Sequence, residues 1–307
     1  MAESPAVRRI VNIFEFLARH PGKRYTSSEL ARELRISHST IQTFLTPLEE
    51  LGYTTRDPTS RRYGLGPAVI PLGEMGQRAK PAARAATAVG EKLAEKLRRD
   101  LVITAATKDD LLVLYQFPQL AGRASSMIPG RRIPLRPPLA LAFMAWADHS
   151  VVESYLERGG VESDAQLRDS YLDLLKQIRR FGYVVTKEIA DIDPQPIVEA
   201  YEQGYDSPGY DGSSAFEISK LGASLAHADY MRAEVGGTES QAIRSISVPI
   251  FGADGRPELA FTVLLSGDRL DGSEVREIAD SVLRAAAEVM DASGGQPPSS
   301  DEFSDGL

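Results

Sequence analysis

The side chains that most often carry catalysis are few in this chain, and their spacing does not indicate a catalytic site. There is no cysteine, and the four histidines lie far apart, at His20, His38, His149 and His227. None belongs to the closely spaced His and Glu patterns that bind a catalytic zinc ion. Asp191 and Asp193 read as turn residues, and the GSSAF segment at Gly212 lacks the second glycine of a nucleophile elbow. We therefore expect no metal, no cofactor and no enzymatic activity.

The segment ISHSTIQTFLTPLEELGY, residues 36–53, indicates a different chemistry. Apolar residues recur in it at helical spacing, and the side chains between them can donate or accept hydrogen bonds. These polar residues are Ser37, His38, Ser39, Thr40, Gln42 and Thr43. An α-helix fits the major groove of B-DNA, where glutamine pairs with adenine and hydroxyl groups contact bases or phosphates. We therefore interpret the segment as a DNA-reading helix; the alternative is the polar face of an ordinary surface helix.

The elements around this segment would hold it in place. Helical spacing predicts one helix over residues 5–20 and a second over residues 26–34, and residues 53–65 read as a β-hairpin. Pro47 lies inside the third helix, where a proline removes a backbone hydrogen bond. The apolar stripe continues through it, so we expect one helix with a local kink. Three short helices followed by a hairpin are typical of a winged helix-turn-helix domain.

The charge of the chain is unevenly distributed. The net formal charge is −8, yet the first 80 residues hold 12 basic and 8 acidic side chains, whereas the remainder holds 23 and 35. A basic end is typical of a domain that binds a polyanion, because lysine and arginine neutralise phosphates. Arg8 and Arg9 on the first helix could contact the DNA backbone. Arg61 and Arg62 near the hairpin tip could reach a phosphate or the minor groove.

The rest of the chain reads as a second domain. Residues 1–66 would form the winged helix-turn-helix, residues 67–99 a linker and a long connecting helix, and residues 100–292 a domain with an antiparallel sheet. Residues 293–307 have the composition of a disordered tail. The predicted fold class is therefore α+β. The chain has neither the apolar core of a signal peptide nor a run of about 20 apolar residues, so we expect a cytoplasmic location.

Residues 7–66, from VRRIVNIF to RRYGLG, resemble the DNA-binding domain of the IclR-type transcriptional regulators. The resemblance continues, in the family's order, through GRRIPL, IRRFGYVVTKE and ISVPIFGADGRPELAFTV. It implies a GAF-like second domain that binds a small-molecule effector, and a homodimer or homotetramer that binds double-stranded operator DNA. The expected function is ligand-responsive transcription regulation. Two alternatives are a DNA-binding protein whose second domain only oligomerises, and an enzyme with an appended helix-turn-helix.

The DNA-reading helix departs from the family's pattern. Such helices often carry Pro-Arg-Ser-Thr and a later His-Arg pair, whereas residues 37–40 of this chain are SHST and residues 42–43 are QT. Two arginines are therefore missing from the face that would enter the groove. We expect Gln42 and the hairpin residues Arg61 and Arg62 to carry more of the recognition.

The resemblance also implies positions for the effector site. The matched residues that could contact an effector are Arg136, Phe143, Trp146, Ser245, Ser247, Thr262 and Leu264. Leu264 replaces one of two hydroxyls usual on its strand, and Phe143 and Trp146 add apolar bulk. We therefore expect an aromatic or alicyclic acid rather than a short keto acid, with Arg136 as the partner of its carboxylate. The simpler alternatives are core packing for the aromatic residues and an ion pair within the protein for Arg136.

Overall fold

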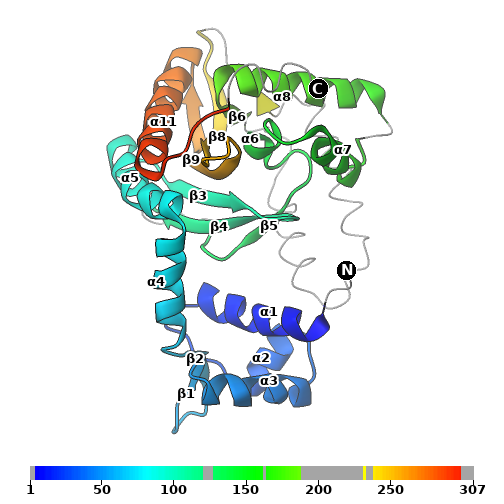
Figure 1. Ribbon diagram of the computed structural model, residues 1–307, viewed down its shortest axis with the longest axis vertical. Helices are drawn as coiled ribbons and strands as arrows, with labels where there is room; N and C mark the ends of the chain where they lie inside the picture. The colour runs from blue at the N-terminus through cyan, green and yellow to red at the C-terminus, as the bar shows by residue number, and fades with distance from the viewer. Residues whose placement is uncertain (1–3, 120–126, 162–163, 188–230, 233–237, 299–307) are drawn as a thin grey trace. The chain divides into compact units, whose positions relative to one another are not determined.

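The structure is a computed structural model that describes residues 4–119, 127–161, 164–187, 231–232 and 238–298 (Figure 1). The described residues fall into two compact units that divide between Lys80 and Pro81. This division lies within the segment expected to link two domains. No helix in the described part of the chain is long and apolar enough to cross a membrane.

The first unit is built from short helices and one hairpin. Its elements are α1 (Pro5–Arg19), α2 (Ser27–Glu33), α3 (His38–Glu50), β1 (Thr54–Arg56), β2 (Tyr63–Leu65) and α4 (Val69–Ala79). Thr26 caps α2 by accepting a hydrogen bond from the Glu29 N–H, and the Glu29 carboxylate accepts one from the Thr26 N–H. This reciprocal pair satisfies two N–H groups that a helix start leaves free. The three predicted helices and the hairpin that follows them are confirmed.

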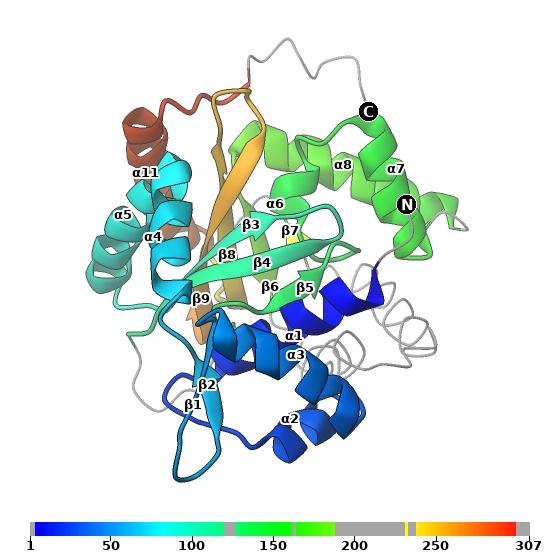
Figure 2. The ribbon, with the colours of Figure 1, turned by 60° about the horizontal axis from the view of Figure 1, so that its bottom comes forward.

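The core of the first unit lies between α1, α2 and α3. Ile13, Leu30, Ile41 and Leu45 are fully buried there, and Tyr63 of β2 packs against the same cluster. Each large apolar side chain removed from water in this way stabilises the fold by about 1.5–3 kcal/mol. The core thus fixes α3 by its apolar face, while β1 and β2 project from the helices as a wing (Figure 2).

α3 continues as a single helix through Pro47, as the apolar stripe predicts. Pro47 is exposed, and so is Thr43, whose carbonyl group loses its usual helical donor because proline has no N–H. Water can replace the missing donor at such an exposed turn. The buried side chains of Ile41, Leu45 and Leu48 span the interruption and hold both parts of the helix against the core.

The second unit contains an antiparallel sheet covered by helices. Its elements are α5 (Pro81–Leu97), β3 (Leu101–Ala106), β4 (Asp110–Phe117), β5 (Arg132–Pro134), α6 (Leu141–Met144), α7 (His149–Arg158), α8 (Ala165–Phe181), β6 (Val184–Lys187), β7 (Met231–Arg232), β8 (Gln241–Phe251), β9 (Pro257–Leu270) and α11 (Gly272–Ser293). The strand order in the described part of the sheet is β5-β4-β3-β9-β8-β6-β7. The predicted α+β class with an antiparallel sheet is confirmed.

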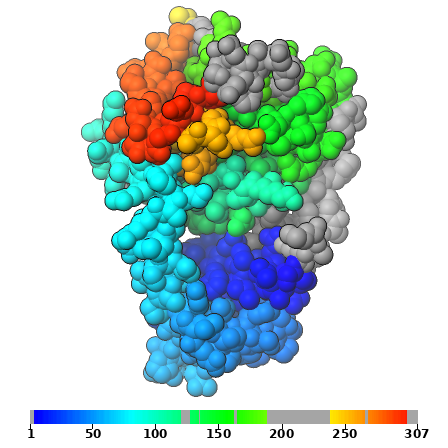
Figure 3. Space-filling model, viewed as in Figure 1, coloured from blue at the N-terminus to red at the C-terminus, as the bar shows by residue number. Residues whose placement is uncertain are grey.

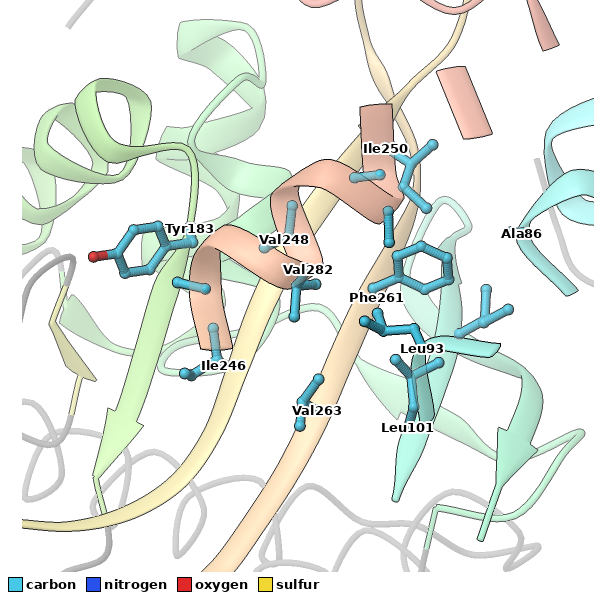
Figure 4. Close-up of a cluster of buried hydrophobic side chains, with 14 of the residues drawn as sticks. Ala86, Leu93, Leu101, Tyr183, Ile246, Val248, Ile250, Phe261, Val263 and Val282 are labelled. Atoms are coloured by element: carbon cyan, nitrogen blue, oxygen red, sulfur yellow. The ribbon is translucent and has the colours of Figure 1, made fainter. Parts of the chain in front are cut away.

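The long helices α5 and α11 cover one face of this sheet, and α6, α7 and α8 lie on the other side (Figures 1 and 2). Alternate residues of the central strands, such as Val248, Phe261 and Val263, point towards α5 and α11 and are buried (Figure 4). α5 approaches the sheet closely at Gly90, where a Cβ atom would lie 3.1 Å from the Phe117 ring. A side chain at this position would therefore force the neighbouring side chains of the sheet to shift.

The strand residues that alternate with these point to the other face of the sheet, away from α5 and α11. Val184 of β6 and Ala260 of β9 pack with α6, α7 and α8 in a second apolar cluster. The sequence of residues 139–147 predicts a short helix, whereas α6 comprises only Leu141–Met144. α11 ends at Ser293, and the next five residues are described, whereas the rest of the expected tail lies outside the described residues. Most of the Gly-, Pro- and Tyr-rich stretch 190–237 also lies outside the described residues.

Candidate nucleic-acid interface and ligand site

Ser37 organises the start of α3. Its hydroxyl oxygen accepts a hydrogen bond from the Thr40 N–H at 3.1 Å, and it lies 2.7 Å from the Thr40 hydroxyl and 3.0 Å from the Ser39 hydroxyl. The first turn of a helix has more N–H groups than one cap can satisfy, and these point out of the helix end. The exposed start of α3 therefore combines hydroxyl groups with free N–H groups, an arrangement that suits a phosphate.

The other predicted contact residues of α3 differ in how free their side chains are. Nε2 of His38 lies 3.0 Å from the hydroxyl of Ser27 at the start of α2, and the Thr43 hydroxyl donates to the Ser39 carbonyl at 3.0 Å. Gln42 is half-buried and forms no side-chain hydrogen bond with the described residues. Its amide therefore keeps the donors and the acceptor that a bidentate contact with adenine needs.

Asp57 orders the loop at the tip of the wing. Its Oδ1 accepts hydrogen bonds from the Ser60 N–H at 2.6 Å, the Ser60 hydroxyl at 2.8 Å and the Thr59 N–H at 3.1 Å. These bonds, chiefly that from the Ser60 N–H, hold the pKa of the Asp57 carboxyl below its usual range. Arg61 closes the loop with φ at 59°, a left-handed conformation uncommon outside glycine. Its side chain is exposed.

Arg62 folds back onto α2. Its Nη1 and Nη2 donate to the two carboxylate oxygens of Glu29 at 2.9 Å and 3.1 Å, and Nη1 also donates to the Arg24 carbonyl at 2.9 Å. Arg61 and Arg62 were expected to have the same role. The structure gives them different surroundings, which residue type and spacing do not reveal. Arg8 and Arg9 lie on α1 and are exposed.

Four of the predicted effector residues come together on the central strands of the second unit. Ser247 pairs with Thr262 across β8 and β9, and Ser245 pairs with Leu264 on the neighbouring rung. The hydroxyls of Ser247 and Thr262 lie 2.9 Å apart. Side chains alternate along a strand, so these four residues share the face opposite α5 and α11. The strand register thus brings two sequence segments together into one patch, which we call the hydroxyl patch on β8 and β9.

Two further hydroxyls belong to this patch and were missed by the sequence analysis. Thr186 on β6 pairs with Ser245, and Thr104 on β3 pairs with Ala260, so both lie on the same face of the sheet. Both residues are buried. The alternation of apolar and hydroxyl residues in LVITAATK and YVVTKE could have indicated them, because residues two apart on a strand share a face.

Phe143 and Trp146 lie in the apolar cluster formed with α6, α7 and α8. Phe143 is 4% exposed and Trp146 is 7% exposed, and the Trp146 ring packs edge-on against the Phe251 ring at 5.1 Å between centroids. This is the core packing considered as the simpler alternative for both residues. Arg136 is half-buried, and its Nε is buried without a hydrogen-bond partner among the described residues. No ion pair with the described residues neutralises its charge.

The described residues also include one cluster of charged side chains on α7 and α8. Nε2 of His149 lies 3.8 Å from the Glu153 carboxylate, which accepts a hydrogen bond from Arg168 at 2.7 Å. The Arg168–Glu153 ion pair joins α7 and α8. Over the described ranges, no three His, Asp or Glu residues are grouped so that they could hold a metal ion.

Comparison with protein families identifies the first unit. Residues 6–58 match the model of the IclR helix-turn-helix domain, a span that runs from the second residue of α1 through α2, α3 and β1. The chain therefore carries an IclR helix-turn-helix domain in its first unit. Among IclR-type proteins, it is 24% identical to the HTH-type transcriptional regulator KdgR of Escherichia coli strain K12 over 161 residues. That alignment covers 51% of this chain and 61% of KdgR, which is less than two thirds of the relative.

Solved structures of IclR-type proteins are similar in fold to this chain over most of its length. The IclR transcriptional regulator from Alicyclobacillus acidocaldarius is 20% identical with a TM-score of 0.64, covering 95% of this chain and 100% of that one. An IclR homolog from Microbacterium hydrocarbonoxydans, complexed with 4-hydroxybenzoate, is 17% identical with a TM-score of 0.58, covering 94% and 98%. At such identities the likeness establishes the fold alone.

Proposed function

We propose that this IclR-type chain regulates transcription by binding double-stranded operator DNA through its first unit and a small organic acid through its second. The observation that carries the proposal is the exposed start of α3. There, Ser37 caps the helix, its neighbours add hydroxyl groups, and the Gln42 amide forms no hydrogen bond within the described part of the chain. A helix presented in this way can enter the major groove and hold a phosphate at its N-terminus. A role on DNA places the chain in the cytoplasm.

The DNA contacts divide by chemistry. The first turn of α3 and the exposed Arg8, Arg9 and Arg61 would contact phosphates, which fix register and supply most of the salt-dependent affinity. Gln42 and Thr43 would contact base edges, which carry sequence preference. The His38 ring lies against the Ser27 hydroxyl, so we assign His38 to the phosphate contacts and not to the base contacts.

Exposed apolar side chains on the first unit support a homodimer or homotetramer. None of the residues of α4 is buried within this chain, and Ile70, Leu72 and Met75 are 68%, 56% and 48% exposed. The side chains of α4 lie at the surface (Figure 3). A monomer gains nothing from leaving such residues in water, whereas a symmetric partner would cover them. Operators with two half-sites match a two-fold protein.

The hydroxyl patch on β8 and β9 supports the acid-sensing half of the proposal. Ser245, Ser247 and Thr262 offer hydrogen bonds beside the apolar Leu264, a mixture typical of small-molecule sites. The guanidinium of Arg136, which forms no ion pair with the described residues, would pair with a carboxylate. The 4-hydroxybenzoate complex of the Microbacterium hydrocarbonoxydans homolog favours an aromatic acid over an alicyclic one for this chain.

The test uses the full chain and a duplex enriched by this protein from a randomised pool. We expect 4-hydroxybenzoate, but not pyruvate, to raise the thermal stability of the protein and to change its duplex affinity by about 5–150-fold. Duplex binding that no acid alters would favour a second unit that only oligomerises. If pyruvate stabilised the protein and aromatic acids did not, the proposed ligand class would be wrong. A chain that enriches no duplex would refute the DNA-binding half.

A further inference from the structure

The Glu29 carboxylate serves two elements at once. Its Oε2 accepts a hydrogen bond from the Thr26 N–H at 2.7 Å, which completes the cap of α2. The same oxygen accepts from Nη1 of Arg62 at 2.9 Å, while Oε1 accepts from Nη2 at 3.1 Å. Two parallel bonds between a guanidinium and a carboxylate fix the orientation of both groups. The start of α2 and the base of the wing are therefore held by one carboxylate.

The backbone beside this contact joins the same two elements. The Tyr25 N–H donates to the Tyr63 carbonyl at 2.9 Å, and the Tyr63 N–H donates to the Tyr25 carbonyl at 2.7 Å. Arg62 immediately precedes Tyr63, and its Nη1 reaches the carbonyl of Arg24, immediately before Tyr25. Tyr25, which leads into α2, thus forms an isolated antiparallel bridge with Tyr63 of β2, and the Arg62 side chain lies beside this bridge.

The two neighbouring arginines of the wing consequently have different freedom. The Arg62 side chain is 41% exposed, but its guanidinium already satisfies three acceptors. A phosphate contact by Arg62 would compete with a carboxylate and a carbonyl that already orient its guanidinium. Arg61 is exposed at the end of the Asp57 loop, and its side chain makes no hydrogen bond or ion pair with the described residues.

We infer that Glu29 and Arg62 form a clamp that positions the wing, so that Arg61, and not Arg62, contacts the phosphate. The inference rests on the proposed DNA binding. Arg62 is then a positioning residue that acts through Arg61. Glu29, although acidic, would promote the binding of DNA, a polyanion. Without the clamp, the wing would move relative to α2 and α3, and its phosphate contact would form in only part of the population.

Glu29→Gln isolates the clamp from the cap. A glutamine at this position still accepts a hydrogen bond from the Thr26 N–H, because the capping box accepts either residue. It loses the charge and the second carboxylate oxygen that hold Arg62. Glu33→Gln is the matched control, since Glu33 lies on the same helix, is exposed and pairs only with the neighbouring Arg32 among the contacts of the described residues.

The sign of the effect distinguishes the clamp from simple electrostatics. Removing a negative charge near DNA should strengthen binding or leave it unchanged, and this is expected for Glu33→Gln. The clamp instead predicts that Glu29→Gln weakens binding to the enriched duplex by roughly three- to tenfold, the scale of one well-formed charged contact. Glu29→Gln that binds as tightly as Glu33→Gln would overturn the inference.

The salt dependence separates positioning from direct contact. Each phosphate contact contributes about 0.9 to the slope of log affinity against log salt concentration. We expect Arg61→Ala to reduce this slope by about 0.9, and Arg62→Lys to lower affinity with a smaller reduction in slope, because the Arg61 contact still forms in part of the population. An Arg62→Ala variant that loses as much slope as Arg61→Ala would make Arg62 a phosphate ligand and refute its positioning role.

A measurement without DNA separates this inference from the proposed function. Hydrogen exchange of the peptide over residues 54–65 should become faster in Glu29→Gln and stay unchanged in Glu33→Gln, because only the first variant frees the wing. Faster exchange in a protein that binds no duplex would leave the clamp in place and reject its role on DNA. Equal exchange in both variants would refute the clamp itself.

Discussion

At the scale of single residues, local chemistry explains the cap of α3 but not the roles of the two wing arginines. Ser37 stands immediately before the first helical residue, where its hydroxyl can reach the Thr40 N–H. Both residues are close in sequence, so the contact can be predicted from the sequence. Arg62 instead depends on Glu29, which lies 33 positions earlier. No local pattern selects that partner.

Ser37→Ala should destabilise the first unit. The substitution removes the acceptor for the Thr40 N–H, and the loss of such a cap typically costs about 1 kcal/mol. Chemical unfolding followed by circular dichroism would measure the change. Ser39→Ala is the matched control, because the Ser39 hydroxyl caps no backbone group of α3. An equal loss of stability in both variants would contradict the assignment of the cap.

The stability of the first unit should fall in acid through Glu29 and Asp57. The Thr26 N–H, followed by its hydroxyl and by Arg62, lowers the pKa of Glu29, and Ser60 lowers the pKa of Asp57. A carboxyl whose pKa is lower in the folded state contributes stability that is fully present above its unfolded pKa, about 4. The contribution is lost as pH falls through the lower folded pKa.

The acid prediction can be checked by chemical unfolding at a series of pH values. Glu29→Gln and Asp57→Asn should each show a shallower loss of stability below about pH 4 than the unchanged protein. Glu33→Gln removes the same charge from the same helix as Glu29→Gln and serves as its control. Parallel pH profiles for all four proteins would contradict the assignment of these two carboxylates.

At the scale of elements, apolar periodicity outweighs the local preference of single residues. Pro47 disfavours a helix, yet the stripe of Ile41, Leu45 and Leu48 buries one face across it, and α3 stays continuous. The helices, the wing and the β8–β9 hairpin were predictable for the same reason, because their apolar residues recur at the helical or strand period. The shorter extent of α6 was not predictable, since its four residues are all apolar and buried.

Pro47→Ala should stabilise the first unit by about 1–2 kcal/mol. Alanine restores the N–H that can bond the Thr43 carbonyl, and part of this gain is offset by the greater freedom of the unfolded chain. The thermal unfolding midpoint should rise, while Thr46→Ala, an exposed neighbour on the same helix, should change it little. A lower midpoint for Pro47→Ala would indicate that the proline serves a packing role.

At the scale of the whole molecule, the chain is two units with separate cores, one matched to the helix-turn-helix family and one built on an antiparallel sheet. Communication between them would take the form of a coupling free energy, in which acid and DNA each change the affinity of the protein for the other by the same factor. The hydroxyl patch on β8 and β9 is the place where that coupling would begin.

Leu264→Thr should change the ligand preference of the second unit. The threonine would place a second hydroxyl on β9, beside Thr262 and across from Ser245. We expect affinity for short oxoacids such as pyruvate to rise by about tenfold relative to 4-hydroxybenzoate, because a hydroxyl gains a hydrogen bond while the apolar contact is lost. Isothermal titration would measure both ligands. Duplex affinity without acid should stay unchanged, and a change there would show that the variant alters the fold.

The sequence by itself determined the features that depend on neighbours along the chain. These are the helix periods, the Ser37 cap, the hairpins, the basic first 80 residues and the IclR-type order of segments. Only the tertiary structure decided which distant groups meet: Arg62 with Glu29, Ser247 with Thr262, and Trp146 with Phe251. The physical reason is that side-chain hydrogen bonds and ring contacts act over a few ångströms in space. Their partners are therefore set by strand register and helix packing, which no short stretch of sequence specifies.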